Sequence, residues 1–256
     1  MWGIFLFLEA RVRIYVINLR RVKKVVAFLL LIALSAAFTV GVLAAVDAYI
    51  YPAVLASAAE KITTVIIDAG HGGEDCGAIG ANGVYEKDLN LAVANAMAEH
   101  FRERGYTVVM TRTDDRMLYS EEENVKGMRK LSDLKNRCKI ASEHENAVLV
   151  SIHMNSFGAK QYSGLQVYYS EGNKASQGLA DAVQKRVRED VQPENNRVTK
   201  NGKGLYLLDN SDITSVIVEC GFVSNEAECE KLSDKEYQNR LSLAIVCGII
   251  EYIEAN

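Results

Sequence analysis

Residues 64–73 read TVIIDAGHGG, a mainly apolar run that leads directly into a glycine-rich turn carrying His71. Residues 147–153 (AVLVSIH) and 215–219 (SVIVE) are arranged in the same way, with an apolar run that ends on a histidine or a glutamate. Short apolar runs rich in Val and Ile are typical of buried strands. We therefore predict that these three segments are strands of one sheet.

Amphipathic stretches separate these strands. Residues 87–104 carry apolar residues at helical spacing, and Gly105 stands where a glycine commonly ends a helix. Further helices are predicted at 132–144, 174–190 and 236–253, and further strands at 106–110 and 165–169. Strands that alternate with helices of this length indicate an α/β domain with helices on both faces of a largely parallel or mixed sheet.

Four polar residues stand where reactive groups are expected in such a domain. His71, His153 and Glu219 each follow an apolar strand, and Glu86 follows the glycine-rich loop and opens the first helix. In open α/β sheets, active sites lie at the carboxyl ends of the strands. The sequence therefore predicts that these side chains meet at one edge of the sheet.

The four residue types fit a catalytic zinc site. Catalytic zinc takes three protein ligands and leaves a fourth position for water, whose pKa it lowers to about 7. His71, Glu86 and His153 supply such a ligand set, and Glu219 is then left as the general acid and base. Cys76 lies close to His71 but is discounted, because thiolate ligands are more typical of structural zinc sites.

Each residue also has a simpler interpretation. His153 fits a buried histidine with a hydrogen-bond partner, and Glu86 fits an acidic residue favoured by the dipole of a helix N-terminus. Glu219 follows the strand-like run SVIV (215–218), where burying a carboxylate without a partner is costly. His71 precedes two glycines, which suits a packed core histidine poorly. Together the four residues favour the metal site.

The N-terminal part of the chain is predicted to lie outside the folded domain. Residues 25–46 carry no charge and are long enough to cross a bilayer as a helix. The basic residues before this run should stay in the cytoplasm, which places the chain after Asp47 outside. They are Arg11, Arg13, Arg20, Arg21, Lys23 and Lys24.

Two interpretations of the apolar run remain open. It is either an uncleaved signal anchor or a cleaved signal peptide, with Ala56-Ser57-Ala58 as the cleavage site. The triplet lies farther from the apolar run than is usual, which favours the anchor. Residues 1–60 are thus predicted to be a basic segment with a membrane or signal helix, and residues 61–256 to be an exported catalytic domain.

Composition adds two exclusions. The 256 residues carry a formal net charge of −4, so no basic excess suggests nucleic acid as the main partner. The five cysteines are irregularly spaced and form no CxxC pair. They are predicted to be mostly small buried hydrophobes, and no disulfide is required.

Residues 114–130 (DDRMLYSEEENVKGMRK) fit the α/β pattern least well. This charged stretch falls between a predicted strand and a predicted helix. It is either a solvated surface loop or a lid over the substrate, since long loops in compact domains are often functional.

Four motifs together resemble the zinc-dependent N-acetylmuramoyl-L-alanine amidases of the amidase-3 family. They are VIIDAGHGG (65–73), EKDLNL (86–91), VSIHMNS (150–156) and IVECGFVSN (217–225), and the resemblance covers nearly all of residues 63–253. It implies a three-layer α/β/α fold with a mixed, mostly parallel sheet. It further implies that His71, Glu86 and His153 bind Zn²⁺ and that Glu219 is catalytic.

The same resemblance implies the substrate. These enzymes cut the amide bond between N-acetylmuramic acid and L-alanine in peptidoglycan, which places the expected activity outside the cytoplasm. Residues 126–141 and 161–170 are similar to the spore-cortex, germination-specific amidases, which remove the stem peptide when muramic-lactam is made. Residues 205–215 lack the arginine and proline of many relatives, so no substrate contact is carried over for that arginine.

Two alternatives are left open. Another zinc hydrolase would cut within the stem peptide, and a non-catalytic module would bind cell wall without creating amino termini. A protein activator is a further expected kind of partner whose identity the sequence does not give.

Overall fold

The computed structural model describes residues 19–50, 62–144 and 146–256. The chain forms two compact units, Met1–Ala59 and Glu60–Asn256. Arg11, Arg13 and the Ala56-Ser57-Ala58 triplet, on which part of the export prediction depends, lie outside the described residues.

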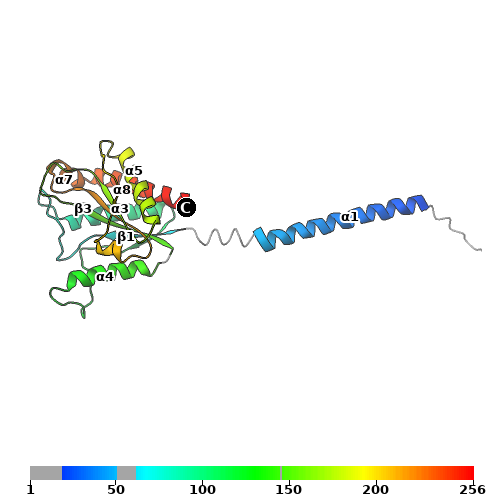
Figure 1. Cartoon of the computed structure of the whole chain (residues 1–256), viewed down its shortest axis with the longest axis horizontal. Helices are drawn as coiled ribbons and strands as arrows, with labels where there is room; N and C mark the ends of the chain where they lie inside the picture. Colours follow the sequence, from blue (N-terminus) through cyan, green and yellow to red (C-terminus); the bar gives the residue numbers. More distant parts are fainter. Residues whose placement is uncertain (1–18, 51–61, 145) are drawn as a thin grey trace, which may run out of the picture. The chain divides into compact units, whose positions relative to one another are not determined.

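The first unit contains helix α1 (Leu19–Ala45), which continues into a short π-helix, η1 (Val46–Ile50) (Figure 1). Between Arg20 and Ile50, the most apolar window of 18 residues has a mean hydropathy of 2.6, and none of that window is buried. By length and composition this helix is able to cross a membrane, a property that signal sequences near an N-terminus share.

The second unit is built on a six-stranded mixed sheet within the described residues, in the order β2-β1-β3-β6-β4-β5. Its strands are β1 (Thr64–Ala69), β2 (Thr107–Met110), β3 (Ala147–Asn155), β4 (Gln166–Tyr169), β5 (Lys200–Asn201) and β6 (Thr214–Phe222). Strands β2, β1, β3 and β6 are parallel, whereas β4 is antiparallel to β6. The predicted mixed, mostly parallel sheet is confirmed.

Helices cover both faces of the sheet, as predicted (Figure 1). One face carries α3 (Glu86–Glu103), α5 (Ala175–Asp190) and α8 (Lys235–Ala255). The other carries α4 (Arg129–Ser142) and the short α6 (Tyr206–Asp209). Helix α7 (Glu226–Ser233) follows β6 and packs against α8.

The α3/α5/α8 face holds the larger apolar core. Alternate residues of β1, β3 and β6 point into it, including Val65, Val150 and Val218, all fully buried. Leu179 and Val183 of α5 pack into the same cluster and are also fully buried. Burial of this apolar surface supplies the main driving force for folding.

The α4/α6 face holds a smaller apolar cluster around Ile66, Leu149 and Leu207. The strand positions nearest the carboxyl edge of this face carry polar groups instead, including Asp68 and Ser151, which are buried. His153 and Glu219 share the strand parity of this face, so the reactive edge of the sheet points toward α4 and α6.

Several elements differ from the predicted ones. Strands β3 and β6 continue to Asn155 and Phe222, so His153 and Glu219 lie within paired strands rather than after them. The strands extend because each keeps a hydrogen-bonding neighbour beyond the apolar run. Strand β5 and helices α6 and α7 were not predicted, because they are too short to show a clear period.

Candidate active site

The parallel strands bring the predicted residues to one edge. His71 lies two residues beyond β1, and His153 of β3 pairs directly with Glu219 of β6. Glu86 is the first residue of α3, so the chain after β1 returns it to the same edge. The expected convergence of the four side chains is therefore present in the structure.

Three of these residues form a group with metal-ligand geometry. Oε1 of Glu86 lies 3.2 Å from Nε2 of His71 and 3.0 Å from Nδ1 of His153. One ligand atom from each of the three residues lies within 4.8 Å of the others. Backbone N–H groups of Ala78 and Met154 donate to the Glu86 carboxylate at 2.8 and 3.1 Å, which fixes its position.

Glycines allow this close approach. A Cβ on Gly70 would lie 2.2 Å from Nε2 of His153, and one on Gly77 would lie 2.6 Å from Oε2 of Glu86. His71 itself has a positive φ of 62°, an uncommon conformation for a residue with a side chain. The loop therefore holds His71 in a conformation that its surroundings must stabilise.

The electrostatics of the group are those of tightly coupled opposite charges. Burial lowers the pKa of His71, but hydrogen bonds to Asp75 and Glu86 outweigh this effect and raise it to about 9. Burial raises the pKa of Glu86, yet His153 and His71 hold it well below its ordinary value. Both imidazole rings face the Glu86 carboxylate, and a cation bound by the same atoms can balance its charge.

Glu219 has a different environment. Its Oε2 atom is buried and has no hydrogen-bond partner among the described residues. Burial raises the pKa of Glu219; His153 opposes this effect and Glu86 adds to it. A carboxylate with a free, desolvated oxygen beside the three-residue group is suited to accept and return a proton.

A buried charge network supports the His71 loop from the α4/α6 face. Arg137 of α4 donates to Asp68 and Asp133, and also to the backbone carbonyls of Ala69 and His71. Burial raises the pKa of Asp68, but Arg137 and hydrogen bonds from neighbouring hydroxyls bring it down to about 2. The network thus connects the body of the domain to the backbone of His71.

A second arginine completes this support. The buried Arg112 donates to the carbonyls of Ala69 and Gly70 at 2.8 and 3.0 Å, and to that of Lys87 at 2.8 Å. These carbonyls lie on the two sides of the loop between β1 and α3. Arg112 therefore holds together the segments that carry His71 and Glu86.

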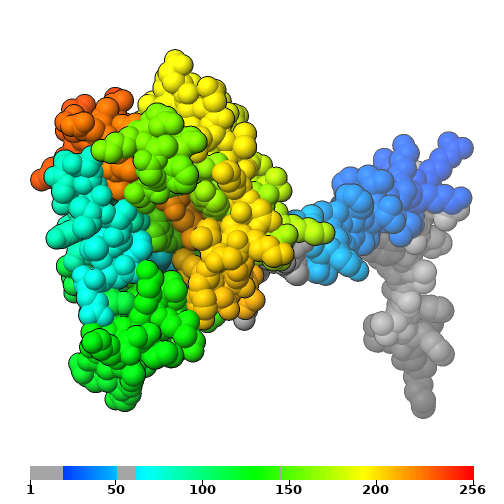
Figure 2. Space-filling model, turned by 60° about the vertical axis from the view of Figure 1, so that its left-hand side comes forward, coloured from blue at the N-terminus to red at the C-terminus, as the bar shows by residue number. Residues whose placement is uncertain are grey.

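A pocket of about 200 Å³ opens beside the two histidines. His71 and His153 line it together with α4 residues such as Lys130 and α6 residues such as Tyr206. Figure 2 shows a hollow between the cyan segment that includes the His71 loop, the green segment that includes α4 and the yellow-to-orange segment that includes α6.

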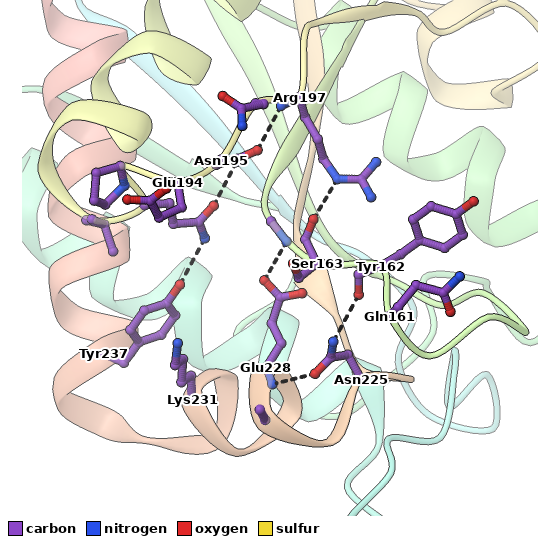
Figure 3. A pocket seen from close by; sticks show the side chains of 16 residues that line it. Gln161, Tyr162, Ser163, Glu194, Asn195, Arg197, Asn225, Glu228, Lys231 and Tyr237 are labelled. Atoms are coloured by element: carbon purple, nitrogen blue, oxygen red, sulfur yellow. Dashed lines mark hydrogen bonds between the residues drawn. The ribbon is translucent and has the colours of Figure 1, made fainter.

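A larger pocket of about 700 Å³ contains none of the four predicted residues. In it, Arg197 donates to the carbonyl of Ser163, and Glu228 accepts from Gly164 N–H, each at 2.7 Å (Figure 3). These bonds fix the approach to β4, whose first residue, Gln166, pairs with Glu219. We place the chemistry at the smaller pocket because His71 and His153 line it, whereas none of the four residues lines the larger one.

Residues 114–130 contact the His71 loop. Asp115 accepts from Gly73 N–H and from Lys87 at 2.7 Å each, and Arg129 pairs with Glu74 at 2.7 Å. The segment is thus anchored to the loop that carries His71, whichever of the two expected roles it has toward substrate. The described cysteines are all free, and Cys76 is not part of the three-residue group.

Sequence reasoning missed the supporting residues. Asp68 gave a usable signal, because a carboxylate in an otherwise apolar strand requires a buried partner. Arg112, Asp133 and Arg137 gave no signal, since charged residues in a loop and on an amphipathic helix are ordinarily solvent-facing. Asp75 was hidden in a glycine-rich turn, where acidic residues are common.

The fold and the site define a class. A His–Glu–His group at the carboxyl edge of a mixed sheet, with a desolvated glutamate beside it, is the arrangement of a candidate metal-dependent hydrolase.

Comparison with known proteins narrows this class. Residues 65–251 match the amidase-3 family, described as N-acetylmuramoyl-L-alanine amidase. The chain is 32% identical over 188 residues to the germination-specific N-acetylmuramoyl-L-alanine amidase of Bacillus subtilis, covering 73% of this chain and 78% of the relative. It is 38% identical over 204 residues to the uncharacterised protein YqiI of the same organism, covering 78% and 90% of the two chains.

Solved structures of amidases are also similar to this chain. The CwlD amidase of Clostridioides difficile, solved in complex with the GerS lipoprotein, is 39% identical with a TM-score of 0.73 and is covered completely by 76% of this chain. The amidase AmiC2 of Nostoc punctiforme is 32% identical with a TM-score of 0.65, over 75% of this chain and 97% of that one.

The chain therefore belongs to the amidase-3 family of N-acetylmuramoyl-L-alanine amidases, close to the spore-cortex members. Peptidoglycan is the substrate of this activity.

Proposed function

We propose that this chain is a zinc-dependent amidase that hydrolyses the bond between N-acetylmuramic acid and L-alanine, with His71, Glu86 and His153 as metal ligands and Glu219 as the catalytic acid and base. The observation that carries the proposal is the buried, unpartnered Oε2 of Glu219 beside the three-residue group. Such an atom is costly to leave without a partner unless it has a function.

The donor set fits zinc. Two imidazole nitrogens and one carboxylate oxygen are the ligands of many catalytic zinc sites, and three ligands leave a position open. The atoms of His71, Glu86 and His153 already lie within 4.8 Å of one another. When bound, zinc polarises a carbonyl oxygen and lowers the pKa of water to about 7.

The residues of the chain then supply proton transfer and hold the ligand group in place. Glu219 accepts the proton of the attacking water at its free oxygen and delivers it to the nitrogen of the departing L-alanine. Its raised pKa suits both steps, because the carboxyl must hold the proton between them. The backbone donors to Glu86 keep the ligand group in place during this exchange.

We further propose that residues 61–256 form the catalytic domain and that residues 1–60 direct it outside the cytoplasmic membrane. The apolar helix α1 with Arg20, Arg21, Lys23 and Lys24 at its start supports this orientation. Detection of the uncleaved chain in washed membranes supports the anchor; a mature chain that begins after residue 58 supports cleavage.

A role in spore-cortex maturation is the finer proposal. It is supported by the similarity to a germination-specific amidase and to an amidase solved with a lipoprotein partner. We expect spores without this gene to lack muramic-lactam in muropeptide analysis. Unchanged muramic-lactam would restrict the enzyme to vegetative wall.

The substitution Glu219→Gln tests the central assignment. The variant should keep zinc and lose about 10²–10⁴-fold in turnover on purified cell wall, because the amide cannot carry the proton. Glu226→Gln, on the exposed surface of α7, is the matched control and should keep normal turnover. Near-normal turnover by Glu219→Gln would refute the assignment.

His71→Ala separates metal binding from proton transfer. It removes a ligand, so both zinc and activity should be lost, whereas Glu219→Gln should lose activity alone. Metal content by atomic emission on the detergent-solubilised chain distinguishes the two.

A further inference from the structure

His71 uses both of its ring nitrogens. Nε2 faces Glu86 at 3.2 Å, within the three-residue group, and Nδ1 faces Oδ2 of Asp75 at 2.9 Å. A neutral imidazole that donates its proton from Nδ1 has its lone pair on Nε2, ready for a metal. Metal-binding histidines commonly donate their second N–H to a carboxylate in this way.

Asp75 is itself held rigidly. Its Oδ1 accepts from Gly77 N–H at 3.3 Å, and its backbone exchanges two hydrogen bonds with Gly72, at 3.0 and 3.1 Å. Lys130, in the first turn of α4, lies 3.2 Å from Oδ2. Oδ2 therefore contacts a cation from α4 on one side and the His71 ring on the other.

The neighbouring Glu74 provides a natural contrast. It pairs with Arg129 at 2.7 Å, so two adjacent carboxylates of one turn bind two adjacent cations of α4. The Glu74 side chain is 56% exposed and makes no recorded contact with His71, whereas the Asp75 side chain is 21% exposed and bonds to it. A purely structural tie between the turn and α4 would need neither pair to touch the ring.

We propose that Asp75 is a positioning residue for the metal site: it fixes the orientation and tautomer of His71 so that Nε2 faces the metal, and Lys130 holds Asp75 in place. The inference rests on the proposed zinc-dependent function, because it assigns the ligand role to His71. Through Lys130, helix α4 then contributes to the metal affinity of the site.

The test compares identical substitutions at adjacent positions. Zinc affinity of the detergent-solubilised full chain is measured by competition with a chromophoric chelator for the wild type, Asp75→Ala and Glu74→Ala. We expect Asp75→Ala to bind zinc about 10- to 100-fold more weakly, and Glu74→Ala to match the wild type. Lys130→Met should show a smaller loss than Asp75→Ala, because the His71 bond survives.

Asp75→Asn keeps the test decisive if Asp75→Ala fails to fold. It preserves size and an acceptor oxygen but removes the charge, so its zinc affinity should fall between those of the wild type and Asp75→Ala. The visible spectrum of the cobalt-substituted protein should also change in this variant, because the ligand field depends on the orientation of His71. A role confined to folding would leave both readouts unchanged.

The outcomes separate the two proposals. A wild type that binds no zinc refutes the proposed function, whatever Asp75 does. A wild type that binds zinc, with Asp75 variants within twofold of Glu74→Ala and an unchanged cobalt spectrum, overturns the positioning role and leaves the proposed function standing.

Discussion

The two faces of the sheet bury different kinds of side chain. Under α3, α5 and α8 the buried residues form one large apolar cluster, with Leu179 and Val183 fully covered. Under α4 and α6 the apolar cluster is small. Arg137 of α4 and Arg112 are the largest fully buried side chains among the described residues, and both bond to the Ala69 carbonyl at the carboxyl edge of the sheet.

The difference separates stability from positioning. Apolar packing is nondirectional, so it stabilises the sheet without aiming particular groups. Arginine donates several hydrogen bonds in a fixed geometry, and both arginines donate to backbone carbonyls of the loop that holds His71. We infer that one face stabilises the domain and the other positions the reactive loop.

Arg137→Met is expected to have the largest effect. It leaves Asp68 and Asp133 buried without their cation, which should cost about 3–5 kcal/mol in the free energy of unfolding. Because Arg137 also bonds to the His71 carbonyl, zinc affinity of the remaining folded protein should fall. Thermal unfolding measures the loss of stability and chelator competition measures zinc affinity. A loss of stability with wild-type zinc affinity would contradict the positioning role of the α4/α6 face.

Leu179→Ala is the counterpart on the apolar face. Truncating this fully buried side chain should cost about 2–5 kcal/mol through lost burial and a cavity. Zinc affinity of the folded variant should stay within twofold of the wild type, since α5 carries no residue of the site. A fall in affinity as large as that of Arg137→Met would show that the faces are not functionally distinct.

Acid should affect the charged face first. The pKa of Asp68 is about 2 in the folded protein, below its ordinary value of 3.8. Its contribution to stability, about 2 kcal/mol, is therefore present above pH 4 and is lost as the pH falls from about 4 to 2. Unfolding free energies across this range should fall less steeply for Asp68→Asn; an identical slope would contradict the prediction.

Gly70→Ala tests the boundary between the faces. The Gly70 carbonyl accepts from Asn90 of α3 and from Arg112, and an added Cβ would meet the His153 ring at 2.2 Å. Overpacking of this kind usually costs about 1–3 kcal/mol in the free energy of unfolding. Displacing the ring should also weaken zinc binding. Gly158→Ala, in an exposed loop with open space around the Cβ, is the control and should bind zinc normally.

Apolar periodicity and the residues at strand ends were sufficient to predict the strands and the place of the candidate site. Apolar runs before His71, His153 and Glu219 predicted the parallel strands, and the carboxyl-edge rule predicted that these residues meet. The structure brings them together as expected, while their roles as ligands and acid–base group remain predictions.

The supporting contacts were not predictable for a physical reason. Arg137 lies far along the chain from Asp68 and His71, and only tertiary packing turns a helix surface cation into a buried one. Asp75 and Lys130 likewise meet only after residues 114–130 fold against the His71 loop. Such contacts depend on which helix covers which face, a choice that local periodicity does not specify.

The most direct test of the account is mass spectrometry of purified cell wall digested with the detergent-solubilised chain, with a chelator, and with the chelator followed by zinc. The account predicts released peptides with L-alanine amino termini and an intact glycan, abolished by the chelator and restored by zinc. New termini within the stem peptide, or release that is indifferent to the chelator, would contradict it.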